Sequence, residues 1–198
     1  KVEPNRAIAE MRRMCYAGVE GVANARDYNN AEKLRSIIYE LYKLEAKDSF
    51  DSFCLALEYD RPIEEQFYYP RREILKPYVD DLQKLADGEI DELFLSCPPR
   101  VGKTTLVMFF LLWMIGKDSE KSNLYCSYSA TITSAFYEGV LEILQDKETY
   151  KWGDIFEGHG IARNGTDALA TTINIDRNKK YASVTCRSLY GTLNGACD

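Results

Sequence analysis

The stretch LFLSCPPRVGKTT, residues 93–105, decides the expected fold. Leu93 to Cys97 is a short apolar run with turn residues directly after it, which is typical of a buried strand. Pro98 to Gly102 predicts a loop. Lys103 then opens an apolar run to Ile115 that predicts a helix. A strand, a tight loop and a helix in this order are the setting of a phosphate-binding loop.

The end of this stretch carries the chemistry. Gly102-Lys103-Thr104 ends as a Walker A motif does. A loop that enters a helix points unpaired backbone N–H groups at one spot, and the helix dipole makes that spot positive. Gly102 would let the backbone approach the phosphates, Lys103 would reach the β- and γ-phosphate oxygens, and the Thr104 hydroxyl would hold Mg²⁺. The sequence therefore predicts ATP and Mg²⁺ as cofactors.

One position departs from the standard pattern, because Cys97 stands where its first glycine belongs. A surface turn before an amphipathic helix is therefore the alternative interpretation. Two prolines stiffen the loop, and Arg100 adds a second cation close to Lys103. Two cations beside a buried helix start would be costly without an anion, which favours a triphosphate. The candidate nucleotide-binding residues of the loop are Cys97, Pro98, Pro99, Arg100, Val101, Gly102, Lys103, Thr104 and Thr105.

The rest of the chain predicts further helices and strands around this loop. We expect helical structure over residues 4–60, helices over 71–86 and 130–144, and strands over 124–126, 171–175 and 181–186. The order β-α-β-α-β-β predicts an α/β sandwich of the P-loop NTPase type with a largely parallel sheet. We divide the chain into an N-terminal helical region, 1–60, and a P-loop ATPase domain, 61–198.

Composition limits the classes of function. The net charge of −6 and the pI of about 5.0 argue against a protein that binds DNA over its whole surface, although a local basic contact stays possible. The six cysteines form no C-x-x-C pair and His159 is the one histidine, which disfavours a zinc site and suits a reducing cytoplasm. The longest apolar run, 106–115, is too short to cross a bilayer, and the first residues predict no export signal.

Several stretches, in order, resemble the large terminase subunit of tailed bacteriophages, the ATP-driven DNA-packaging motor. Residues 97–104 are similar to that family's variant Walker A motif, P-P-R-x-G-K-[ST], which often lacks the first glycine. Residues 127–130 (SYSA) and 152–156 (WGDIF) resemble the segments that follow it. Residues 189–198 resemble the G-x-x-x-G-x-x-D segment that leads into the Walker B strand. The resemblance covers residues 62–198, and its most specific part is the variant Walker A motif.

The resemblance implies a P-loop ATPase of the additional-strand type that moves double-stranded DNA into a procapsid. Its implied partners are double-stranded DNA, a small terminase subunit and a portal protein, and its implied assembly is a homo-oligomeric ring. The implied location is the cytoplasm of the infected bacterial host, with no membrane. Arg100 and Lys103 inherit catalytic roles, with Arg100 sensing the γ-phosphate. Tyr69 and Arg72 become candidates for contact with adenine, and a helix start with Arg71 and Arg72 in solvent is the alternative.

Relatives place an arginine early in the helix after the SYSA segment, where a neighbouring subunit could use it. Residues 136–138 (FYE) offer none in this sequence. Arg163 and Arg187 are possible substitutes, and either could equally be an ordinary surface charge.

Hydrolysis also needs a Walker B carboxylate and an adjacent acid that positions water. The acidic positions considered are Asp80-Asp81, Asp91-Glu92 and Asp176, and none ends a strand as a pair after the loop. In the family order Walker B would follow Asp198, so we expect an incomplete ATPase domain without a nuclease domain. A non-hydrolysing P-loop module and a helicase-type P-loop ATPase remain alternatives. An apolar strand ending in two acids directly after Asp198 would favour the motor, and helicase motifs there would favour the helicase-type ATPase.

Overall fold

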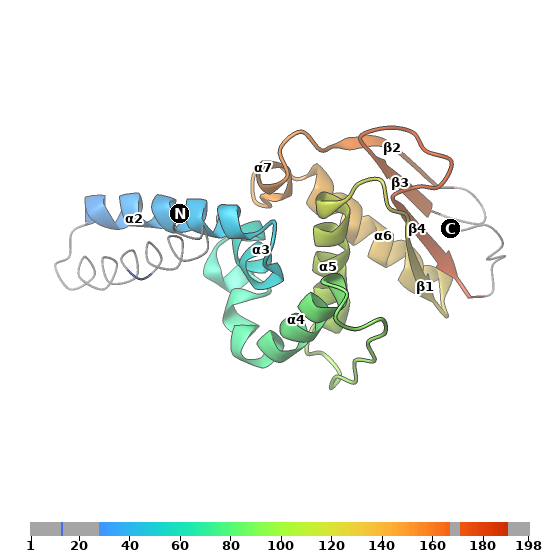
Figure 1. Ribbon diagram of the computed structural model, residues 1–198, viewed down its shortest axis with the longest axis horizontal. Helices are drawn as coiled ribbons and strands as arrows, with labels where there is room; N and C mark the ends of the chain where they lie inside the picture. The colour runs from blue at the N-terminus through green and yellow to red at the C-terminus, as the bar shows by residue number, and fades with distance from the viewer. Residues whose placement is uncertain (1–12, 14–27, 167–170, 190–198) are drawn as a thin grey trace.

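The computed structural model describes residue 13 and residues 28–166 and 171–189. The helices are α2 (Tyr28–Glu45), α3 (Phe50–Leu57), α4 (Arg72–Ala86), α5 (Lys103–Lys117), α6 (Ala130–Gln145) and α7 (Trp152–Ile155), with short 3₁₀ turns η1 (Ile63–Glu65) and η2 (Tyr69–Arg71). The strands are β1 (Asn123–Ser127), β2 (Ile161–Thr166), β3 (Thr171–Ile175) and β4 (Val184–Ser188). Helices α2 to α4 lie on one side and the sheet on the other, with α5 and α6 between them (Figure 1).

The described part of the N-terminal region is helical, as predicted. Helix α3 begins at an N-cap, Ser49, whose hydroxyl accepts the N–H of Ser52 at 3.2 Å. Nearly every residue of α3 is buried, because it packs against α2, α4, α5 and α7. The apolar side chains of α2 are only partly buried, since Leu41 lies in the core whereas Leu44 is exposed.

The helices expected around the loop are confirmed, α4 ending before Gly88 and α5 running from Lys103 to Lys117. The apolar side chains of α5 enter the core, and the indole N–H of Trp113 donates to the carbonyl of Ala46 at 2.7 Å. At the far end of α5, a Cβ on Gly116 would lie 2.3 Å from the ring of Phe156. The C-terminal half of α5 is therefore held by the helical part of the molecule.

The sheet is mixed, and the prediction of a largely parallel sheet is wrong. Its order is β1-β4-β3-β2, in which only β1 and β4 are parallel, while β2, β3 and β4 run antiparallel. The connections between the last three strands are too short for a crossover, so they join antiparallel neighbours. Strand β2 (IARNGT) was not predicted, because its sequence has no apolar run. The described architecture is thus mixed α/β with helices packed on one face of a four-stranded sheet.

The strand expected at 93–97 does not form. This segment is extended and Phe94 is 90% exposed, whereas Leu93 and Leu95 pack against the core. The alternation is that of a strand, but a strand also needs a neighbour for its backbone hydrogen bonds. Among the described strands, none pairs with this segment. The loop is therefore not preceded by a sheet strand.

One hydrophobic core joins the helices to the sheet. It contains Phe53 from α3, Trp113 from α5, Phe136 from α6, and Ile173 and Val184 from the sheet. Residues from both sides of the sequence boundary at 60/61 thus share this core. Among the helices of the described ranges, none combines the length and the apolar character needed to cross a bilayer.

Candidate functional site

The predicted phosphate loop ends in a left-handed glycine. Gly102 has φ 96° and ψ 22° and is the N-cap of α5, and Arg100 also has a positive φ of 64°. Glycine tolerates this region freely, whereas an arginine there is uncommon. The N–H of Leu106 donates to the carbonyl of Gly102 at 3.0 Å, which starts the helical bonding. The N–H groups of the first helical turn before Leu106 have no partner within the helix.

The charged side chains of the loop are open to solvent. Arg100, Lys103 and Thr104 are exposed, and Val101 is half-buried against the core. Among the described residues, neither Arg100 nor Lys103 forms an ion pair. The argument that two buried cations require an anion therefore does not apply here, because both cations are hydrated. What remains is a pair of unneutralised cations at the positive end of a 15-residue helix.

An aromatic ring that the sequence did not single out lies on the glycine. A Cβ on Gly102 would be 2.2 Å from Cε2 and 2.7 Å from Cζ of Phe67. The same ring packs edge-on against Phe109 of α5, with centroids 5.5 Å apart, and the Arg71 guanidinium lies 5.6 Å from its centroid. Gly102 therefore has a packing reason to be glycine in addition to any role toward phosphate.

A buried carboxylate fixes the backbone on which Phe67 stands. Glu58, 2% exposed, accepts the N–H of Phe67 at 2.9 and 3.0 Å through its two oxygens and the N–H of Tyr68 at 2.9 Å. Burial raises the pKa of Glu58, and the two backbone N–H groups only partly oppose it. Glu58 and Phe67 were missed from the sequence, where the only signal was the aromatic run 67–69 before a helix.

Arg72, one of the two candidates for adenine contact, is bonded to an acid of α3. Arg72 donates to both oxygens of Asp51 at 3.0 and 2.7 Å, and the Tyr68 hydroxyl donates to the same carboxylate at 2.5 Å. Burial alone would raise the pKa of Asp51, but these hydrogen bonds outweigh it and lower the pKa. Arg72 thus ties α4 to α3, and it also begins α4 with an exposed side chain, as the alternative of a solvent-exposed helix start expects.

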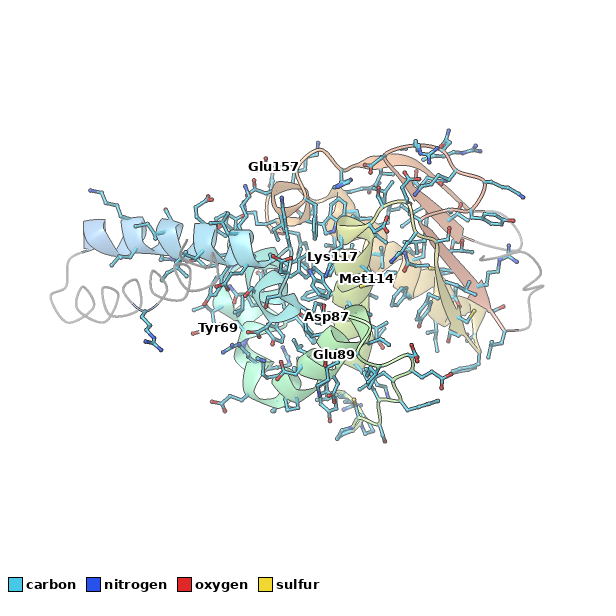
Figure 2. All side chains as sticks on the ribbon, in the orientation of Figure 1. Tyr69, Asp87, Glu89, Met114, Lys117 and Glu157 are labelled. Atoms are coloured by element: carbon cyan, nitrogen blue, oxygen red, sulfur yellow. The ribbon has the colours of Figure 1, made fainter. Side chains whose placement is uncertain are left out.

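Tyr69 is 58% exposed and stands on the helical side of the molecule (Figure 2). It lines a hollow of about 730 Å³ between α2, α3 and η1, and none of the residues lining that hollow belongs to the loop 97–105. This hollow, lined by described residues, thus holds Tyr69 without Lys103.

Cys97, the residue in the place of the first glycine, contacts α4. A charge interaction and a hydrogen bond with Cys97 raise the pKa of Tyr78. The prolines that follow, Pro98 and Pro99, are exposed, and Thr105 is half-buried. Of the cysteines in the described ranges, Cys54 and Cys186 are buried, whereas Cys97 and Cys126 are not.

Three of the acidic residues considered for hydrolysis have other partners, whereas Asp91 and Glu92 are exposed. Asp80 and Asp81 lie within α4 and pair with Lys76 and Lys84 of the same helix. Asp176, at a positive φ of 63°, accepts the Ser119 hydroxyl at 2.6 Å, contacts Nδ1 of His159 at 2.6 Å and accepts the N–H of Gly160 at 3.1 Å.

Within the part of the chain that the structure describes, no three acidic, histidine or cysteine residues gather as metal ligands. Asp198, the end of the segment expected to lead into Walker B, lies outside the described residues.

The remaining described segments of the resemblance lie at the junction of β1 and α6 and on α7. Residues 127–130 leave β1 and begin α6, and residues 152–156 contain α7, whose Trp152 donates its indole N–H to the carbonyl of Leu112 at 2.8 Å. Arg163 lies on β2 and Arg187 on β4.

Comparisons with protein families, with curated proteins and with solved structures find no match for this chain. The function is therefore argued from its own residues.

Proposed function

We propose that the loop 97–105 binds the triphosphate of ATP together with Mg²⁺. The observation that carries this proposal is the junction at Gly102, where a left-handed glycine opens α5 and leaves exposed, unneutralised cations at Arg100 and Lys103. An anion at that position gains from the free N–H groups, the helix dipole and two cations at once. A plain surface turn before a helix needs neither cation.

The donor set fits a nucleotide phosphate better than it fits a free metal ion. Exposed at the start of α5 are the Lys103 ammonium, the Thr104 hydroxyl and the first-turn N–H groups. Mg²⁺ is usually held by few protein oxygens together with phosphate oxygens and water. Thr104 would supply a protein oxygen to Mg²⁺, and Mg²⁺ would neutralise charge on the phosphates that Lys103 and Arg100 contact.

The resemblance to large terminases extends this to a motor. We propose that the chain is the ATP-binding part of a large terminase subunit with a P-loop ATPase fold, which couples hydrolysis to translocation of double-stranded DNA. Arg100 would contact the γ-phosphate. Double-stranded DNA, the small subunit, the portal protein and further copies in a ring would be its partners, in the cytoplasm of the infected host.

A second candidate function is nucleotide binding without hydrolysis. The observation that favours it is the engagement of three acids considered for hydrolysis, since Asp80 and Asp81 pair within α4 and Asp176 is bonded to Ser119 and His159. Binding needs only the loop, whereas turnover needs an acid to position water.

The test compares two lysines of the same helix. Lys103→Ala removes a charge from the start of α5, and Lys117→Ala removes one from its end, where the ammonium lies 4.1 Å from the Trp113 ring centroid. A charge-assisted contact contributes about 1.5–3 kcal/mol, so titration calorimetry with a non-hydrolysable ATP analogue should show Lys103→Ala binding roughly 10- to 100-fold more weakly. Lys117→Ala should bind like the wild type. Equal affinity in wild type and Lys103→Ala refutes the proposal.

Measuring phosphate release from ATP then distinguishes the motor from the non-hydrolysing module. Turnover that duplex DNA stimulates and that Lys103→Ala abolishes supports the motor. Binding that Lys103→Ala abolishes, without any turnover, supports the non-hydrolysing module.

A further inference from the structure

The backbone of Phe67 is held from both sides. Its N–H donates to the two carboxylate oxygens of Glu58 at 2.9 and 3.0 Å, and its carbonyl accepts the Arg71 guanidinium at 3.0 Å. The next N–H along the chain, that of Tyr68, also donates to Glu58, at 2.9 Å. The carboxylate is 2% exposed, so little water competes for these bonds. The position of Phe67 therefore depends on how well Glu58 accepts hydrogen bonds.

The ring of Phe67 transmits this position to the predicted phosphate loop. A Cβ on Gly102 would lie 2.2 Å from its Cε2, and the ring also packs edge-on against Phe109 of α5 with centroids 5.5 Å apart. Packed groups transmit small displacements because they leave little free volume. Gly102 in turn sets the direction of the first N–H groups of α5, which an anion beside Lys103 would use. The contacts thus connect Glu58, through Phe67, to the start of α5.

Opposing effects act on the ionisation of Glu58. Burial favours the neutral acid and raises the pKa of Glu58. The N–H groups of Phe67 and Tyr68 favour the carboxylate and only partly offset burial. A hydrogen bond to a charged acceptor is roughly twice as strong as one to a neutral acceptor. Protonation of Glu58 therefore relieves the cost of burying a charge and at the same time weakens the hold on Phe67.

The other titratable and charged groups around Glu58 are Cys54 of the same helix, Arg61 and Arg71 of the following segment, and Tyr150 of the α6–α7 connection. The Nε of Arg61 lies 4.0 Å from the carboxylate. Burial raises the pKa of both Cys54 and Tyr150, so both stay neutral in acid. Arginine keeps its charge there. Within this set Glu58 is therefore the group whose charge changes as the pH is lowered.

We propose that Glu58 is a positioning residue for the loop 97–105, and that its ionised form, acting through Phe67, favours a triphosphate beside Lys103. This inference rests on the proposed binding of ATP at the same loop. A loop that is already held in its binding geometry loses less freedom when the ligand arrives, which raises affinity. Protonation of Glu58 then lowers the affinity for ATP, although this carboxylate touches no part of the nucleotide. By reciprocity, bound nucleotide favours the ionised form of Glu58 by the same factor.

Glu58→Gln provides the main comparison, because its amide has the shape of the neutral acid and does not ionise. Calorimetric titrations with a non-hydrolysable ATP analogue and Mg²⁺ are made at several pH values from 5 to 8. The measured quantity is the affinity of the wild type divided by that of Glu58→Gln, in which the titration of the analogue itself cancels. A charged acceptor contributes about 5-fold more to an equilibrium constant than a neutral one, so the ratio should reach about 5 at pH 8 and fall towards 1 in acid.

Two further variants show whether the effect passes through Phe67. Phe67→Leu removes the ring carbons that lie on Gly102, so in this background Glu58→Gln should have the same effect at every pH. Asp51→Asn makes the same acid-to-amide change elsewhere on α3. Against the effect of burial, hydrogen bonds lower the pKa of Asp51, so this carboxylate stays ionised from pH 5 to 8. The ratio of wild type to Asp51→Asn should therefore not change with pH.

A ratio of wild type to Glu58→Gln that is constant with pH overturns the proposal, and so does an undiminished pH dependence in the Phe67→Leu background. Lys103→Ala at pH 8 separates this failure from that of the proposed function. Lost binding in Lys103→Ala together with a constant ratio means that the loop binds ATP without help from Glu58, whereas equal binding in wild type and Lys103→Ala removes both proposals.

The wild type alone gives a second measurement if Glu58→Gln does not fold. The carboxyl carbon of Glu58, followed by NMR as the pH is changed, reports its acid dissociation constant directly. This constant should be about 5-fold larger with the ATP analogue bound than without it, because the linkage is reciprocal. An acid dissociation constant that the analogue leaves unchanged overturns the proposal.

Discussion

Replacing Gly102 by alanine would tell whether this glycine serves packing, phosphate or both. The new methyl group would meet Phe67 at 2.2 Å from Cε2 and 2.7 Å from Cζ, against an ordinary contact of about 3.5–4.0 Å. The residue would also have to keep φ at 96°. Gly102→Ala is therefore expected to destabilise the fold by two separable costs.

The magnitudes follow from these two costs. A left-handed conformation costs an L-residue about 1–2 kcal/mol, and forcing an extra methyl into a packed site costs about 1–3 kcal/mol. The sum is about 2–5 kcal/mol. Phe67→Leu provides the matched background, because leucine lacks the two ring carbons, Cε2 and Cζ, that would clash. The ring carbon closer to the Phe67 backbone, Cδ2, lies 3.4 Å from the Cβ position at Gly102. In that background Gly102→Ala should cost only the conformational part, about 1–2 kcal/mol.

The assay is urea unfolding of the wild type, the two single variants and the double variant. A coupling of about 1–3 kcal/mol between the two positions is expected. Additive effects, with a coupling below about 0.5 kcal/mol, would refute the close approach of Phe67 to the loop. The same four proteins, titrated with an ATP analogue, then address function. Recovered ATP binding in the double variant would mean that the glycine serves packing alone, and binding that stays lost would mean that phosphate needs the bare backbone.

Two other side chains give tests that do not depend on Gly102. Arg100→Ala should weaken ATP about 10-fold or more while changing ADP little, because its proposed contact is to the γ-phosphate, and equal losses by calorimetry would make it a general phosphate clamp. Glu58→Gln should change the pH dependence of stability. The pKa of Glu58 is raised by burial, so its contribution is fully present below the ordinary glutamate pKa of about 4.3 and is lost as the pH rises through the raised value. Urea unfolding from pH 4 to pH 7 should therefore show the wild type losing stability relative to Glu58→Gln, and a constant or opposite difference would contradict the burial of this carboxylate.

Local features of the fold were predictable because their signals are local. Helices α4 and α6 have apolar residues at helical spacing, α5 begins at the lysine of Gly-Lys-Thr, and Gly88 lies just beyond the C-cap of α4. The strands β3 and β4 also fell near their predicted positions, although β4 begins at Val184 instead of residue 181. Each of these depends on residues within about one turn or one hairpin of each other.

Pairing was not predictable because it joins distant residues. The run 93–97 has the apolar character and the alternation of a strand, yet no described strand lies beside it to accept its backbone hydrogen bonds. Nothing within five residues encodes that neighbour. Strand β2 shows the converse, since its polar sequence joins the sheet through its antiparallel partner β3.

In the candidate site, too, the local features could be predicted from the sequence and the contacts between distant residues could not. The left-handed glycine and the exposed Lys103 could be read from the motif, since glycine is the residue that adopts this conformation freely. Phe67 could not, because it lies 35 residues before Gly102 and reaches it only through the packing of α3 against α5. The partner of Arg72 could not be predicted for the same reason, because Asp51 is 21 residues away on another helix.

These contacts change what holds the phosphate loop in place. In the interpretation from sequence, a sheet strand fixed the start of the loop, and its helix packed on that sheet. In the structure the loop is positioned by the helical layer: Glu58 fixes the backbone of Phe67, and Phe67 covers Gly102. An anion bound at Lys103 would therefore stabilise α3 and its connection to α4 before it affected the sheet. Hydrogen exchange with and without an ATP analogue should show added protection first at residues 58–68, and protection confined to the sheet would mean that the strand-based arrangement forms when nucleotide binds.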